Sequence, residues 1–85
     1  MTKEKVQEVA IYYEEYLHNY GRQGIIENHC KYILEQILTF IKQNNTEKAM
    51  RWLGFVQGCL WTCHYFTIDE LRGHNRVEGK PHDLI

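Results

Sequence analysis

Hydrophobic residues in the first quarter of the chain recur with the period of an α-helix. They are Val6, Val9, Ala10, Tyr13, Tyr16, Leu17 and Tyr20. Side chains at this spacing share one helical face, so the pattern predicts a helix over residues 3–20 with that face toward a core. Gly21 follows directly and is suited to the left-handed conformation that ends many helices.

A second hydrophobic stripe predicts a second helix, which begins near Ile25 and ends at the segment KQNNTEK, residues 42–48. Its apolar members are Ile26, Cys30, Ile33, Leu34, Ile37, Leu38 and Ile41. In the segment that ends it, Asn44 is expected to cap the next helix. The Glu47 side chain would reach back to that cap, as in a capping box.

The third predicted helix runs over residues 46–65 and contains the most apolar stretch of the chain, RWLGFVQGCLW (51–61). Its expected core residues are Trp52, Leu53, Val56 and Leu60. The other face is also apolar at Phe55 and Cys59, so we expect this helix to be covered on more than one side. Gln57 would then need a buried hydrogen-bond partner.

The segment TIDE, residues 67–70, has the pattern of a second capping box and predicts a short fourth helix that ends near Asn75. No sustained alternation of polar and apolar residues predicts a strand. The expected fold is therefore all-α: a small bundle of three to four helices built on an antiparallel hairpin of the second and third, with the first packed across them. In this prediction residues 1–76 form one domain and residues 77–85 form a polar, flexible tail.

Gly54 and Gly58 lie four residues apart inside the third predicted helix, where each costs roughly 1 kcal/mol relative to alanine. At this spacing they line one side of the helix and allow another backbone to approach closely. Two neighbours remain open: the second helix of the same chain, or the third helix of a second copy. Because so small a domain has difficulty burying Trp52, Phe55 and Trp61 together, we favour a homo-oligomer with contacts at these five residues.

The charge balance argues against non-specific binding of nucleic acid. Ten basic and eleven acidic residues are scattered along the 85-residue chain, which gives a net charge of −1 at pH 7. The longest apolar stretch spans about eleven residues, well short of the roughly twenty needed to cross a bilayer. The first ten residues also lack the apolar core of a signal peptide. We therefore expect a cytoplasmic protein without a membrane partner.

The residues that could support metal binding or catalysis do not form a coherent set. The cysteines and the histidines beside them are His29, Cys30, Cys59, Cys63 and His64. Structural zinc sites pair such ligands at short loop spacings, whereas these residues lie within predicted helices in apolar surroundings. We interpret the cysteines as buried thiols, and we expect no metal, no cofactor, no catalytic residue and no enzymatic activity.

Tyrosines give the stronger indication of a binding surface. Tyr12, Tyr16 and Tyr20 recur every four residues, so their rings can lie along one ridge of the first helix, suited to a protein partner or to stacking on nucleobases. Polar and basic residues near the fourth helix can add contacts to phosphates or bases. The expected binding residues are Tyr12, Tyr16, Tyr20, Arg22, Arg72, His74, Asn75 and Arg76.

The segments EKAMRWLGFVQGCLW and TIDELRGHNR, within residues 47–76, resemble a family of small, mostly uncharacterised accessory proteins of tailed bacteriophages. Members of this family contain segments that look like R-W-L-G-F-x-Q-G-x-L-W and T-I-D-E-L-x-x-H-N. At TCHYF (62–66) the chain departs from the small or glycine residues expected there. In its N-terminal half the likeness is limited to a general helical character.

This resemblance implies a non-enzymatic phage protein that binds a host or antiphage-defence component in the host cytoplasm and inhibits it stoichiometrically. Two alternatives stay open. One is an oligomeric sponge that binds a nucleotide signal, with tyrosines stacking on bases and basic side chains holding phosphates. The other is a nucleic-acid-binding module.

Overall fold

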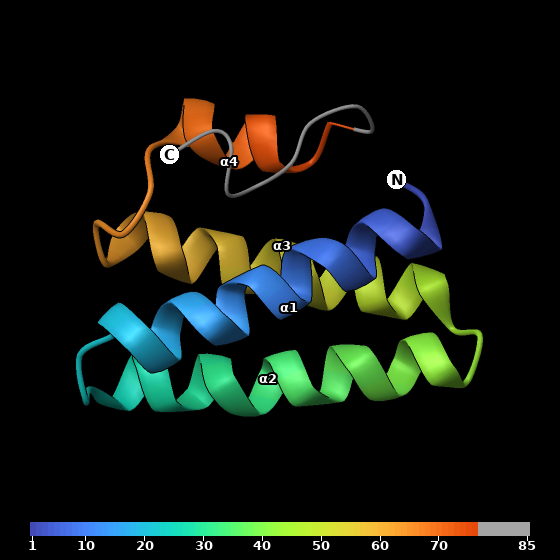
Figure 1. Ribbon diagram of the computed structural model, residues 1–85, viewed down its shortest axis with the longest axis horizontal. Helices are drawn as coiled ribbons and strands as arrows, with labels where there is room; N and C mark the ends of the chain where they lie inside the picture. Colours follow the sequence, from blue (N-terminus) through green and yellow to red (C-terminus); the bar gives the residue numbers. More distant parts are fainter. Residues whose placement is uncertain (77–85) are drawn as a thin grey trace.

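The computed structural model describes residues 1–76 of the chain and contains four helices in this part. They are α1 (Lys3–Tyr20), α2 (Ile25–Lys42), α3 (Thr46–Thr62) and α4 (Ile68–His74). α2 and α3 run antiparallel as a hairpin, α1 crosses one face of that hairpin, and α4 lies along the side of α3 that is remote from α2 (Figure 1). The described residues contain no strand, which confirms an all-α bundle built on a helical hairpin. The predicted flexible tail, 77–85, lies outside the described residues.

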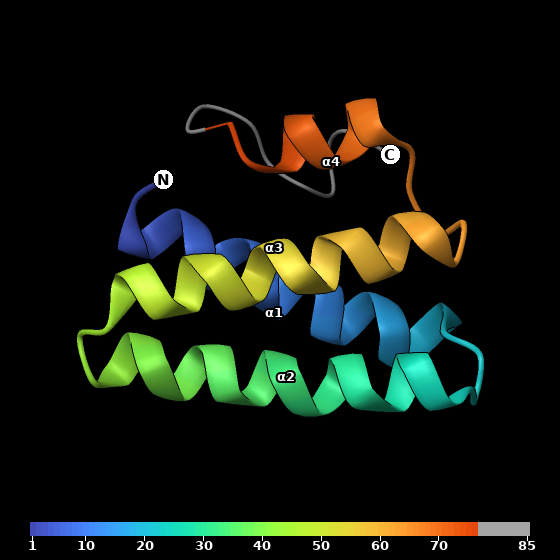
Figure 2. The ribbon, with the colours of Figure 1, turned by 180° about the vertical axis from the view of Figure 1, so that it is seen from behind.

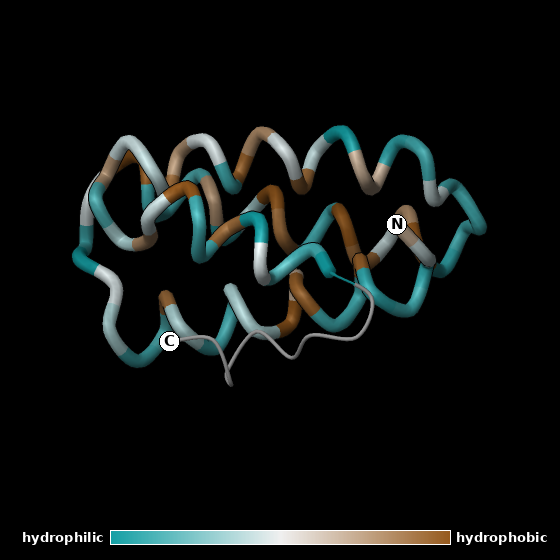
Figure 3. Tube along the Cα trace, turned by 90° about the horizontal axis from the view of Figure 1, so that it is seen from above, coloured by the Kyte–Doolittle hydropathy of each residue, from teal (hydrophilic) through white to brown (hydrophobic). Residues whose placement is uncertain are grey.

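The hydrophobic core lies between α1 and the α2–α3 hairpin. Side chains with at most 1% exposure come from all three long helices and include Val6, Val9, Tyr13, Leu17, Leu34, Ile37, Leu53 and Val56. Each of these residues occupies a position that the hydrophobic periodicity assigned to a buried face. Figure 3 shows the same pattern as an alternation of hydrophobic and hydrophilic segments along the helices. Trp52 departs from the prediction: it lies half-buried at the edge, with its ring 5.0 Å from that of Phe40.

α3 ends at Thr62 rather than at residue 65 as predicted. The cause is a left-handed residue, His64, whose φ is 65°. In this conformation the His64 amide donates to the Trp61 carbonyl at 3.0 Å and the Tyr65 amide donates to the Leu60 carbonyl at 2.9 Å. These two bonds satisfy carbonyls in the last turn of the helix and turn the chain toward α4. Glycine would adopt the left-handed conformation of His64 at a lower energetic cost.

The turn between α2 and α3 uses the same geometry. Asn44 is the left-handed residue, at φ 60°, and the Asn44 and Asn45 amides donate to the carbonyls of Ile41 and Phe40. The N-cap of α3 is consequently Asn45, whose side chain accepts from the Lys48 amide. The prediction that Asn44 caps this helix was therefore wrong, because closing α2 already fixes its conformation.

Of the other two predicted helix ends, one is confirmed and one is wrong. Thr67 and Glu70 form the capping box: the Glu70 amide donates to Thr67 Oγ1 at 3.1 Å, and the Thr67 amide donates to Glu70 Oε1 at 2.8 Å. Gly21 has φ −73° and is not left-handed. A Cβ at Gly21 would lie 2.5 Å from the Leu17 carbonyl oxygen, so close approach to the preceding turn explains the glycine.

A buried polar network joins α1, α3 and α4. The Gln57 side-chain amide donates to Tyr13 Oη at 3.1 Å and to Asn75 Oδ1 at 2.7 Å, and Asn75 Nδ2 donates back to Gln57 Oε1 at 3.2 Å. The Tyr13 hydroxyl also bonds to His74 Nδ1 at 2.7 Å. Gln57 thus has the buried partner that its position required, and the network fixes the short α4 against the three-helix core.

Candidate binding surfaces

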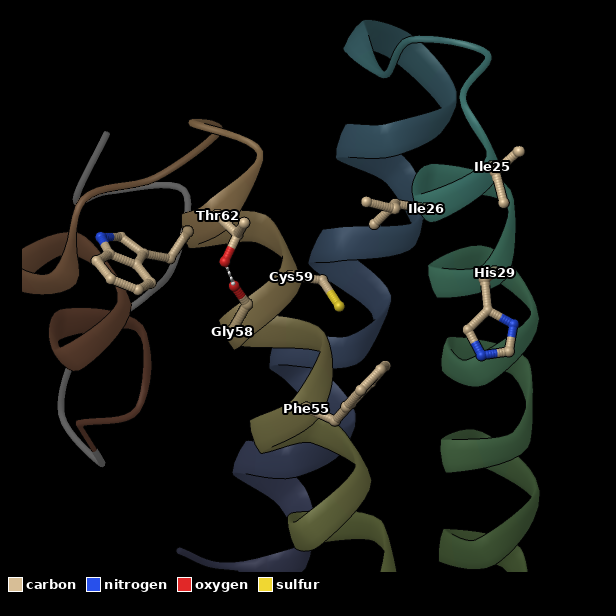
Figure 4. A pocket seen from close by; sticks show the side chains of 8 residues that line it. Ile25, Ile26, His29, Phe55, Gly58, Cys59 and Thr62 are labelled. Atoms are coloured by element: carbon tan, nitrogen blue, oxygen red, sulfur yellow. Dashed lines mark hydrogen bonds between the residues drawn. The ribbon is translucent and has the colours of Figure 1, made fainter.

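The outer face of the α2–α3 hairpin, opposite α1, is not covered by another described helix (Figure 2). A groove of about 620 Å³ runs along it at the start of α2 and the end of α3. Phe55 and Cys59 of α3 point toward α2 there, and His29 and Ile26 lie on the opposite wall (Figure 4). Ile25 at the rim is 89% exposed, and Phe55 is 55% exposed.

Two smaller grooves extend this surface. One, of about 330 Å³, shares His29 and Phe55 with the first and adds Tyr32, Arg51 and Trp52. The other, of about 300 Å³, lies between α3 and α4. We call the exposed hydrophobic residues of the three grooves the apolar face: Ile25, Ile26, Tyr32, Phe55, Trp61 and Ile68.

Gly54 and Gly58 lie on the exposed side of α3, next to the apolar face. A Cβ built on either residue has no atom of the described chain within 4 Å. Of the two neighbours that the sequence left open, a closely packed helix of the same chain is therefore excluded for the described helices. The core side of α3 is already occupied by Leu53, Val56 and Leu60, which turns the two glycines outward.

The three tyrosines predicted to form a ridge line a groove of about 420 Å³ on α1, which we call the tyrosine groove. Their rings form a continuous row, with centroids 5.9 Å apart for Tyr12 and Tyr16 and 5.0 Å apart for Tyr16 and Tyr20. Tyr12 and Tyr16 are half-buried and Tyr20 is 71% exposed. Burial and the nearby Tyr16 and Glu70 raise the pKa of Tyr12 to about 12, so its hydroxyl stays protonated near neutral pH.

Arg22 does not line the tyrosine groove. It lies in the turn between α1 and α2, at the end of the bundle where this turn meets the turn between α3 and α4, and contacts there hold its side chain. Its Nη2 donates to the Cys63 carbonyl at 2.7 Å, its Nε donates to Glu27 Oε2 at 3.2 Å, and its guanidinium carbon lies 4.6 Å from the Tyr65 ring centre. The Tyr65 hydroxyl donates to the same Glu27 oxygen at 2.7 Å. The hydrogen bond from Tyr65 and the Arg22 charge lower the pKa of Glu27. Sequence reasoning missed both Glu27 and Tyr65. Tyr65 lies 38 residues from Glu27, and Arg22, although only five residues from Glu27, is separated from it by the turn between α1 and α2 rather than by one helical turn.

The predicted residues near α4 do not form one site. His74 is completely buried and Asn75 is half-buried in the network with Gln57, whereas Arg72 and Arg76 are exposed. Arg72 lines the groove between α3 and α4, which shares no lining residue with the tyrosine groove. Its nearest acidic partner is Asp69, at 3.9 Å. The structure thus brings the three tyrosines together, with the buried His74 ring 5.6 Å from that of Tyr12, and separates them from Arg72.

The three cysteines were predicted to be buried, which is confirmed for Cys30 only: Cys59 and Cys63 are half-buried, and Cys59 lines the groove between α2 and α3. Cys30 is buried, and burial together with the adjacent Cys59 raises its pKa to about 12. Within residues 1–76, no group of three or more histidine, cysteine or acidic side chains is arranged to hold a metal ion. In the same part of the chain, no helix is long and apolar enough to cross a membrane.

Comparison of the chain with protein-family models, with curated proteins and with solved structures gave no match. The class of protein is therefore defined by the fold and its surfaces alone: a small all-α bundle with an exposed apolar face and a separate tyrosine groove.

Proposed function

We propose that this chain is a non-enzymatic bacteriophage accessory protein that binds a host or antiphage-defence protein in the host cytoplasm and inhibits it by stoichiometric interaction. The observation that carries the proposal is the exposed hydrophobic and aromatic surface, which consists of the apolar face and the tyrosine groove. This surface remains although the three long helices already enclose a buried core. Exposed apolar patches of this kind are typical of protein interaction sites. The resemblance of residues 47–76 to phage accessory proteins supports the biological context.

We assign the apolar face to self-association and the tyrosine groove to the target. A Cβ at Gly54 or Gly58 would meet no described atom within 4 Å, so packing among the described helices does not require glycine there, yet each glycine lowers helix stability. A second copy whose α3 crosses at these glycines would use the space they leave. Phe55 and Trp61, both at least half exposed, would then be covered on the two sides of the crossing.

Alanine at both glycines provides a test of self-association. In an isolated chain Gly54→Ala with Gly58→Ala should raise the free energy of unfolding by about 0.5–1 kcal/mol per site, because neither Cβ meets an atom. In the proposed oligomer the same methyl groups should weaken association. Light scattering during gel filtration measures the mass, with Gln7→Ala on the exposed surface of α1 as the control. An oligomer that persists undiminished in the double variant would remove the glycines from the interface.

Affinity capture from host lysate tests the proposed inhibition. The wild-type chain should retain one host or defence protein in a fixed ratio, and Tyr20→Ala should release it, because Tyr20 is exposed in the tyrosine groove and its loss leaves the core intact. Activity of the captured protein, measured with increasing amounts of this chain, should fall to a plateau at that ratio. A lysate from which nothing is retained would contradict the proposal.

A nucleotide sponge is the second candidate, and the groove of about 330 Å³ between α2 and α3 favours it. There the rings of Tyr32, Trp52 and Phe55 and the Arg51 guanidinium line one hollow, a combination suited to a stacked base and a phosphate. A thermal-shift panel of cyclic and linear nucleotides tests it. A ligand at a hundredfold its dissociation constant adds roughly 2.7 kcal/mol of stability, and Arg51→Gln should remove the shift. The nucleic-acid module has less support, because Arg22 is held by Glu27 and Arg72 lies in a different groove from Arg51.

A further inference from the structure

The tyrosine groove combines aromatic rings with negative charge. Besides the three tyrosines, the charged residues in its lining are Glu8 and Glu15. Glu15 is exposed, and the charge of Glu70 on α4 also acts on Tyr12. The lining contains no basic side chain among the described residues, although Lys5 lies 3.4 Å from Glu8 beside it. The groove therefore presents π faces and carboxylates to whatever binds there.

The same chain shows how these two groups hold a cation. At the end of the bundle, the Arg22 guanidinium stacks on the Tyr65 ring at 4.6 Å and bonds to the Glu27 carboxylate at 3.2 Å. The planar guanidinium can do both at once, because it stacks through its face and donates through its edge. The tyrosine groove has the rings of this arrangement and, in Glu15, an exposed carboxylate. No basic residue of the described chain lines the groove, and Lys5 at its edge pairs with Glu8.

We propose that the tyrosine groove binds an arginine-containing basic segment of the target protein. The guanidinium would stack on Tyr20 or Tyr16 and pair with Glu15, with the remaining negative charge favouring further basic residues in the segment. This assignment rests on the proposed function and specifies the chemistry of the partner. A phosphate-bearing ligand fits the groove poorly, because Glu15 and Glu70 would repel it.

Titration of labelled peptides against the full chain tests the proposal, with fluorescence anisotropy as the readout. The probes are a nine-residue peptide with three arginines, its lysine counterpart and its glutamate counterpart. The arginine peptide should bind most tightly, the lysine peptide several-fold more weakly, and the glutamate peptide not at all. Raising the salt concentration should weaken binding of both basic peptides.

Variants locate the peptide on the surface. Glu15→Lys and Tyr20→Ala should each weaken binding of the arginine peptide by about fivefold or more. The first substitution reverses a charge in the groove, and the second removes an exposed ring. The controls are Glu35→Lys on α2, which makes the same charge change, and His18→Ala on α1, which removes another exposed ring. Both residues lie outside the groove lining, so binding should stay within about twofold. Circular dichroism confirms that each variant is folded.

The possible results separate the two proposals. If Glu15→Lys and Glu35→Lys lose the same affinity for the arginine peptide, the net charge of the chain explains the loss, and the groove assignment is overturned. A lower solution mass of Glu15→Lys or Tyr20→Ala would mean that a second copy occupies the groove, which also overturns it. A target retained from lysate by both groove variants would leave the proposed function intact while rejecting this inference. Arginine-peptide binding at the groove without any retained target would reject the proposed function alone.

Discussion

Replacing Tyr13 with alanine is expected to lower the free energy of unfolding by about 3–5 kcal/mol, the range for removing a large aromatic side chain from a core. Tyr13 is completely buried in α1, and its ring packs near Phe66 and His74, at centroid distances of 5.7 and 5.5 Å. A domain of this length has a total stability of about 4–13 kcal/mol. The expected loss is therefore a large fraction of the total stability, and at the lower end of that range it removes all of it.

Tyr13→Phe separates the hydrogen bonds from the packing. The ring remains, but His74 Nδ1 loses its 2.7 Å partner and Gln57 loses one of two acceptors. The expected cost is about 1–3 kcal/mol, since buried polar groups are left without partners. Urea unfolding followed by circular dichroism measures both changes.

The control is Tyr32→Phe, which removes a hydroxyl from a tyrosine that is 55% exposed on α2. Its free energy of unfolding should stay within about 0.5 kcal/mol of the original chain. If Tyr13→Phe is as stable as this control, the buried network contributes nothing measurable and α4 is held by hydrophobic packing alone.

Acidification is expected to destabilise the fold through His74. The Tyr13 hydroxyl accepts from Gln57 and shares a 2.7 Å hydrogen bond with His74 Nδ1, in which the donor depends on the tautomer of the imidazole. Nε2 is buried and has no hydrogen-bond partner among the described residues. The rings of Tyr12, Tyr13 and Phe66 surround the imidazole, and Glu70 is the nearest acidic residue that acts on it.

Burial lowers the pKa of His74 below its usual value of 6.5, and Glu70 opposes this only in part. The unfolded chain therefore binds more protons than the folded chain once the pH falls below about 6.5. Stability should be level above that pH and should fall as the pH drops through the window between 6.5 and the lower folded pKa. One proton limits the slope to about 1.4 kcal/mol per pH unit.

Urea unfolding between pH 5 and pH 8 measures this slope. His74→Gln should be less stable at neutral pH but should lose the part of the slope that belongs to the histidine. His18→Gln, at an exposed position on α1, should keep the slope of the original chain. If the two variants have the same pH dependence, His74 does not titrate as a buried group.

Local features of the sequence were sufficient to predict the helices. The period of the hydrophobic residues gave the bounds of α1 and the start of α2, and the Thr67–Glu70 capping box gave the start of α4. These features depend on neighbours within one helical turn or on the repeat of a single face. The same argument identified Gln57 as a buried polar residue in need of a partner.

The candidate surfaces were predicted less completely. The row of Tyr12, Tyr16 and Tyr20 followed from their spacing, because residues four apart always share a helical side. The burial of His74 and the capture of Arg22 by Glu27 did not follow from any spacing. The first depends on how α4 packs against α1, which is distant along the chain. The second depends on the course of the turn between α1 and α2 and on Tyr65 from the turn before α4.

Taken alone, the sequence determined which residues form helices and which side chains share a face, because both are set by contacts between near neighbours in the chain. The tertiary structure decided what lies against each face. It turned Gly54 and Gly58 outward, left Phe55 exposed and placed His74 in the interior. Periodicity cannot specify these outcomes, since a glycine or an aromatic residue on a second apolar face fits equally well against a helix of its own chain, a second copy or solvent.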